Sequence, residues 1–187
     1  LKVTPASFVK GVSDIEAAQR FASQYENCFK LNNCQKFAAR LVANEDGPEA
    51  IVNNVCEEQG VTITSNPTVK LNLVNHFDIP TEIADKWGQE GLTYVIEFLK
   101  ECWPNDEKRL QGRFMNVAEM AYLYTRGPKK ENVEALKNFI KGFKTCDAFV
   151  GYCMQTVMNS DNPILSDNSG AKSMLRIAEE VLNAART

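Results

Sequence analysis

Apolar residues recur at three- and four-residue steps along almost the whole chain, and this spacing constrains the fold more than any other feature. Such a step places apolar side chains on one face of an α-helix. One such face runs from Ile15 through Phe21 to Phe29, and Ser13 and Glu16 before it have the spacing of a capping box. Because these faces must be buried against other elements, the chain is predicted to be an all-α helical bundle or array.

The pattern divides into about seven helices, separated by turn-forming and capping residues. Pro128 opens the longest pattern, which continues to Val157 and whose later part is apolar on all sides, as in a buried central helix. Gly88 and Gly91 are predicted weak points of an earlier helix. A chain of 187 residues without a repeat or linker is expected to form one domain, residues 1–187. The predicted helices cover approximately residues 13–29, 33–42, 48–60, 80–104, 105–127, 128–157 and 174–182.

Residues 61–79 are the least helical part of the sequence. Val61, Ile63, Leu71 and Leu73 alternate with polar residues, a period of two that is typical of strands. The segment is therefore predicted to be extended or to contain a short β structure. Because an isolated hairpin is only marginally stable, an ordered loop packed on helices is favoured over a pair of strands.

Six cysteines form an even set, and the chain begins with Leu rather than Met, which suggests a processed N-terminus. Both features favour an oxidising compartment and three disulfides, so a secreted, extracellular protein is expected. The alternative is a set of buried free thiols, because reduced cysteine packs as a small apolar residue. The predicted disulfide residues are Cys28, Cys34, Cys56, Cys102, Cys146 and Cys153.

Helix geometry restricts how these cysteines can pair. Cys146 and Cys153 are seven residues apart in one predicted helix, which separates their Cα atoms by about 10.5 Å. A disulfide requires less than about 7 Å, so these two cannot bond to each other. They are predicted to staple their helix to two neighbours through Cys56 and Cys102. The remaining pair, Cys28 and Cys34, is predicted to bridge the break between the first two helices.

Charge and motif content exclude several classes of protein. A net charge of −3 is unlike that of a strongly basic nucleic-acid binder, and no apolar run reaches the roughly 18 residues of a membrane span. Phosphate-binding, dinucleotide-binding and serine-hydrolase glycine motifs are absent. The single histidine, His76, is interpreted as a hydrogen-bonded structural residue, with a pH sensor as the alternative. No catalytic residue, cofactor or metal site is predicted, and the chain is expected not to be an enzyme.

A basic stripe follows one helix face at Lys137, Lys141 and Lys144. Its simplest interpretation is a solvated surface. The alternative is a site for an anion or an acidic headgroup.

The supply of large apolar residues leads to the functional prediction. Ten Phe, five Tyr, five Met and two Trp can fill a core or wall a cavity between helices. We predict a secreted binding protein that encloses a small hydrophobic ligand, such as a fatty acid or another lipid. The alternative is a secreted effector, of the venom, salivary or body-fluid type, with a filled core and a surface that contacts a protein partner. The predicted ligand-lining residues are Phe114, Met115, Phe139, Phe143, Val150, Met154 and Met174.

Overall fold

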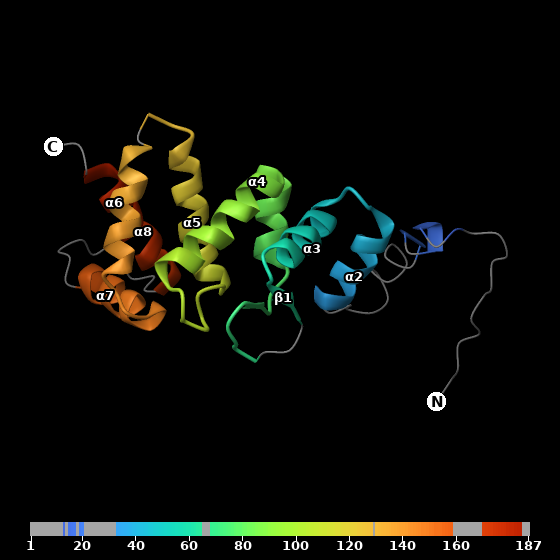
Figure 1. Cartoon of the computed structure of the whole chain (residues 1–187), viewed down its shortest axis with the longest axis horizontal. Helices are drawn as coiled ribbons and strands as arrows, with labels where there is room; N and C mark the ends of the chain where they lie inside the picture. The colour runs from blue at the N-terminus through green and yellow to red at the C-terminus, as the bar shows by residue number, and fades with distance from the viewer. Residues whose placement is uncertain are drawn as a thin grey trace.

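The chain is mostly helical, as predicted (Figure 1). The computed structural model describes residues 13, 15–17, 19–20, 33–64, 68–128, 130–158 and 170–184. Residues 15–17 and 19–20 are helical. The bounded helices among the described residues are α2 (Asn33–Ala43), α3 (Pro48–Glu58), α4 (Asp78–Cys102), α5 (Gly112–Thr125), α6 (Glu131–Lys141), α7 (Cys146–Met158) and α8 (Gly170–Ala184).

The helices form an elongated array in which neighbours in sequence are mostly neighbours in space (Figure 1). Helix α3 packs against α2 and α4, and α4 packs against α5. Helix α8 returns to contact α5, α6 and α7, which closes a bundle at one end of the array. Buried residues from Phe37 on α2 to Leu182 on α8 belong to one hydrophobic cluster. The described helices therefore share a continuous core.

Local signals at several helix ends are confirmed. The Glu16 backbone N–H donates to Ser13 Oγ at 3.2 Å, which satisfies a free donor of the first turn. Pro48 occupies the first turn of α3, and Gly60 just beyond α3 has a φ of 61°. Gly88 interrupts α4 with φ 65° and ψ −163°, a conformation essentially restricted to glycine, so the predicted weak point is a kink.

Asp106 explains two differences from the predicted helices. The helix expected from residue 105 begins only at Gly112, because Asp106 Oδ1 accepts the Lys108 backbone N–H at 2.8 Å and holds a turn. The helix expected over 128–157 is two helices, α6 and α7. Asp106 Oδ2 accepts the Cys146 backbone N–H at 2.7 Å, so a side chain far away in the sequence stabilises the new start of α7.

The extended segment contains two very short strands, β1 (Thr62–Ile63) and β2 (Leu73–Val74). They pair in parallel, with Thr62 opposite Leu73, so the predicted short β structure is confirmed and the preference for a loop without strand pairing is wrong. The hairpin considered as its alternative is also wrong, since a hairpin is antiparallel. Strand β1 packs against α3. This tertiary support, together with the buried Val74, accounts for a strand pair that would be too short to persist alone.

The predicted disulfides are not found. Cys34, Cys56, Cys102, Cys146 and Cys153 are free thiols, and Cys28 lies outside the described residues. The helix order gives the reason why Cys56 does not pair with α7. Helix α3, which carries Cys56, packs on α4, whereas α7 packs on α8 at the other end of the array (Figure 1). Because these cysteines are free, disulfides no longer support secretion, which stays a prediction.

The four buried thiols should resist alkylation in the native protein. Burial raises the pKa of Cys56 to about 11 and that of Cys102 and Cys153 to about 12, and it also raises the pKa of Cys146. Because the thiolate is the reactive form, these residues should react at least about tenfold more slowly with iodoacetamide at pH 7.5 than after denaturation. Half-buried Cys34 is the internal control. Peptide mass spectrometry without reduction measures both outcomes, and a disulfide-linked pair among these five would contradict the expectation.

Candidate functional site

Four aromatic side chains form a continuous strip along α4 and α5, which we call the aromatic strip: Trp87, Tyr94, Phe98 and Tyr122. Tyr94 and Phe98 are four residues apart on α4 and share one helix face, whereas Trp87 precedes the kink at Gly88. The ring centroids of Tyr94 and Tyr122 lie 5.3 Å apart, those of Trp87 and Tyr122 lie 5.9 Å apart, and those of Tyr94 and Phe98 lie 6.0 Å apart. These separations are typical of favourable aromatic pairs.

Gly91 makes room for the strip. A Cβ atom at this position would lie 2.2 Å from Trp87 Cβ and 3.2 Å from Tyr122 Cε1. Glycine therefore lets the Trp87 and Tyr122 side chains meet across α4, although it weakens the helix by about 1 kcal/mol relative to alanine. Gly91, a predicted weak point of the helix, is therefore needed for the contact between these two side chains.

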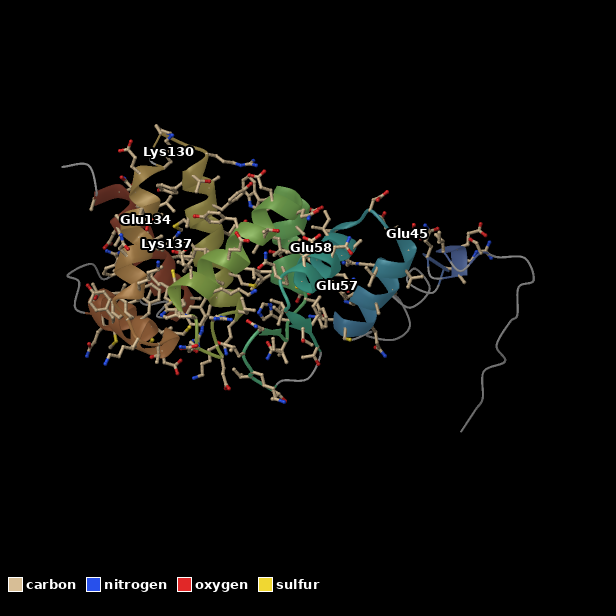
Figure 2. The ribbon with its side chains drawn as sticks, in the orientation of Figure 1. Glu45, Glu57, Glu58, Lys130, Glu134 and Lys137 are labelled. Carbon is tan, nitrogen blue, oxygen red and sulfur yellow. The ribbon has the colours of Figure 1, made fainter. Side chains whose placement is uncertain are left out.

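The chain's own cations cover both ends of the aromatic strip. Arg126 Cζ lies 4.9 Å from the centre of the Tyr122 ring and 5.7 Å from that of Trp87. At the other end, Lys137 Nζ lies 5.8 Å from the centre of the Phe98 ring. Figure 2 shows Lys137 on α6 and Glu58 on α3, with α4 between these helices. All three distances are within the range of cation–π attraction, so the faces of these rings favour positive charge.

Carboxylates hold these two cations. Arg126 Nη2 lies 3.5 Å from Glu90 Oε2, and Lys137 Nζ donates to Glu101 Oε2 at 2.9 Å. Hydrogen bonds from Lys137 and Lys141 lower the pKa of the Glu101 carboxyl. Glu101 is therefore ionised at neutral pH and fixes Lys137 against the strip.

An open pocket lies between the two covered ends. Its volume is about 550 Å³, and its lining contains two carboxylates and no basic side chain. The exposed Glu97 carboxylate accepts a hydrogen bond from Gln59 Nε2 at 3.1 Å, but it has no ion pair in the part of the chain that the structure describes. The lining residues are Gln89, Glu90, Thr93, Tyr94, Glu97 and Tyr122.

The hydroxyl groups of the two tyrosines that line the pocket have different surroundings. Burial raises the pKa of Tyr94 to about 12, so its hydroxyl is protonated. Tyr122 is only 2% exposed, and among the described residues its hydroxyl has no hydrogen-bond partner. A buried polar group without a partner costs about 1–3 kcal/mol. Tyr122, which lines the pocket, therefore has a buried hydroxyl whose hydrogen bonds are not satisfied by the described residues.

A second, larger pocket of about 670 Å³ lies between the C-terminal end of α4 and the connection from α6 to α7. Most of its charged groups already have partners within the chain, whereas Glu107 and Lys144 have no ion pair among the described residues. Lys108 pairs with Asp147, Lys141 pairs with Glu101 at 2.7 Å, and Asp106 accepts two backbone N–H groups. We therefore place the candidate site at the aromatic strip.

The predicted basic stripe is not a single helix face, because α6 ends at Lys141 and Lys144 lies in the connection to α7, and it is only partly solvated. Lys137 and Lys141 both bind Glu101, which joins α6 to α4, and the Lys137 side chain is only 17% exposed. Lys144 is exposed. The anion-site interpretation stays a prediction, although two of its three lysines already hold a carboxylate.

The predicted ligand-lining residues fall into two groups. Phe114, Met115 and Met174 have no exposed surface and belong to the core. Val150 is nearly buried, whereas Phe139, Phe143 and Met154 are partly buried at the edge of the core. The rings of Phe139 and Phe143 lie 5.3 Å apart and both contact Phe149. Ligand binding by this set stays a prediction, because its central members already pack against other core residues.

His76 has the structural hydrogen bond expected of it. Its Nε2 lies 3.2 Å from the Leu110 carbonyl oxygen, and its Nδ1 is buried without a partner among the described residues. Burial lowers the pKa of His76, so the ring is neutral at pH 7 and its Nε2–H donates to Leu110. A role in pH sensing stays a prediction.

Among the described residues, no three or more His, Cys, Asp and Glu side chains are grouped so that they could hold a metal ion. No described helix combines the length and the apolar character that crossing a membrane requires. Comparison with known proteins finds no matching family model, no matching curated protein and no matching solved structure.

Proposed function

We propose that this chain is a non-enzymatic protein-binding module that contacts its partner through the aromatic strip. The observation that carries this proposal is the open pocket lined by Tyr94, Tyr122 and two carboxylates. Tyrosine and tryptophan are enriched where proteins bind proteins, because each combines a large rigid apolar surface with a polar tip. Charged side chains surround the aromatic strip, and this combination is the composition of such a contact surface.

The buried core supports a surface site over an interior one. Phe114, Met115 and Met174, which were predicted to wall a ligand cavity, are completely buried within the hydrophobic cluster. Enclosing a fatty acid between them would require these side chains to move out of close packing. The surface-acting alternative needs no such rearrangement.

Partner capture tests the proposal. The wild-type chain, Tyr94→Ala and Tyr152→Ala are immobilised and exposed to an extract of the cells that produce the protein. Tyr152 is a matched control, since it is a 42% exposed tyrosine on α7, away from the strip. We expect a partner that binds to the wild type and to Tyr152→Ala and is lost with Tyr94→Ala. Equal capture by all three proteins would refute a contact through the strip.

The carrier alternative makes a different prediction. A fluorescent fatty acid should show no saturable binding to the purified chain, because the predicted wall residues are packed. Saturable binding that Phe143→Ala removes and Tyr94→Ala leaves intact would favour the enclosed lipid instead. Displacement titration by fluorescence separates the two cases.

A further inference from the structure

The chain itself shows which chemistry the aromatic strip holds. Arg126 lies over Tyr122 and Trp87, and Lys137 lies over Phe98. Each of these cations is also held by a carboxylate, Glu90 for Arg126 and Glu101 for Lys137. Two different basic side chains thus use the same combination, an aromatic face on one side and a carboxylate on the other.

The pocket between them repeats this combination without a cation. Partly exposed Tyr94 supplies an aromatic face, buried Tyr122 lines the same pocket, and Glu97 supplies a carboxylate that has no ion pair among the described residues. On the other side of the lining, Glu90 shares its charge with Arg126 at 3.5 Å. The acidic lining excludes an anionic ligand and favours a positively charged one.

The Tyr122 hydroxyl is a second, independent indication of a ligand. Tyr122 lines the pocket and is 2% exposed, and its hydroxyl oxygen has no hydrogen-bond partner in the described part of the chain. Ammonium and guanidinium groups are donors only, and a tyrosine oxygen can accept from either of them. A basic side chain can therefore satisfy both the carboxylate and this hydroxyl.

We infer that the Tyr94–Tyr122 pocket binds a lysine or arginine side chain from a basic segment of the partner protein. This inference rests on the proposed function and adds the chemistry of the partner. Arg126 and Lys137 lie at the two ends of the strip, so the pocket takes one inserted cation between two resident ones. The neighbouring basic residues of the segment face Glu90 and Glu97 at the exposed rim.

Titration with a defined peptide tests the inference. The probe is a fluorescein-labelled hexa-arginine peptide, followed by fluorescence anisotropy, with a hexa-glutamate peptide as its counterpart. We compare the wild type with Glu97→Lys and with Glu45→Lys, which have the same net charge. Glu45 is an exposed residue at the turn between α2 and α3, far from α5 (Figure 2). A third variant, Tyr94→Phe, keeps the ring, and Tyr94→Ala removes it.

The inference predicts that hexa-arginine binds to the wild type and that hexa-glutamate does not. Glu97→Lys and Tyr94→Ala should each weaken binding about tenfold or more, whereas Glu45→Lys and Tyr94→Phe should change it less than about threefold. Circular dichroism confirms that each variant is folded. If Glu45→Lys weakens binding as much as Glu97→Lys, the attraction is a general effect of net charge and the inference fails. Failure of the peptide to bind, with partner capture still lost in Tyr94→Ala, would overturn the basic segment while leaving the protein-binding function intact.

Discussion

Replacing Phe114 with alanine is expected to lower the free energy of unfolding by about 3–5 kcal/mol, the range for a fully buried phenylalanine. Phe114 has no exposed surface, and its ring centroid lies 5.3 Å from that of Trp103 in an edge-to-face arrangement. A cation also lies over the ring, with Arg113 Cζ 4.9 Å from the Phe114 ring centre. Truncation removes these contacts and leaves a cavity that the surrounding helices can only partly fill.

Urea unfolding followed by circular dichroism measures this loss. Leu123→Ala is the matched control, since Leu123 lies on the same helix, α5, and is 50% exposed. A surface change of this kind should stay within about 0.5 kcal/mol. A Phe114→Ala protein as stable as the control would show that this side chain borders open space, and would restore the predicted ligand cavity.

The parts of the fold that could be predicted are those determined by local chemistry. Pro48 and Gly60 bound α3 as expected, because the fixed φ of proline suits a first turn and a left-handed φ suits glycine. Ser13 accepts its predicted hydrogen bond because a serine hydroxyl at a helix start can accept from a free backbone N–H of the first turn. The described helices could be located because most helix faces repeat every three or four residues.

The missed features depend on contacts between distant residues. The sequence predicts a helix from residue 105, but the two carboxylate oxygens of Asp106 accept backbone N–H groups from Lys108 and from Cys146 at the start of α7, 40 residues away. No local pattern contains that information. The parallel pairing of Thr62 with Leu73 likewise depends on how the chain packs around α3.

The aromatic strip escaped prediction for a related reason. Tyr94 lies on α4 beside the apolar residues Val95 and Ile96 and was not distinguished from them, while Tyr122 is on a different helix. Their juxtaposition depends on the approach of α4 to α5. The sequence signal that was available is Gly91, a glycine inside a helix that indicated a weak point. Its role as the position that admits both rings needed the structure.

Replacing Arg109 with methionine is expected to lower the free energy of unfolding by about 3 kcal/mol. Hydrogen bonds to charged groups contribute about 1.5–3 kcal/mol each, and the losses of several such bonds at one side chain do not add up fully. Arg109 is 4% exposed. Its Nη1 donates to the Trp103 carbonyl at 3.0 Å and also to the Pro104 carbonyl, and its Nη2 donates to Asn72 Oδ1. Methionine keeps much of the volume but leaves these buried acceptors without a donor.

The same substitution should loosen two particular segments. Arg109 joins Asn72, where φ is 56° just before β2, to the turns that connect α4 with α5. Hydrogen exchange should therefore accelerate at residues 71–74 and 103–111 and stay unchanged in α8, which Arg109 does not reach through any of these bonds. Lys144→Met changes an exposed cation and is the control. It should leave the exchange rates unchanged and the free energy of unfolding within about 0.5 kcal/mol of that of the wild type. Uniform acceleration along the chain, or none at all, would show that Arg109 does not act as this clamp. Because the clamp fixes the connection between α4 and α5, its loss is also expected to disorder the approach of Tyr122 to Tyr94.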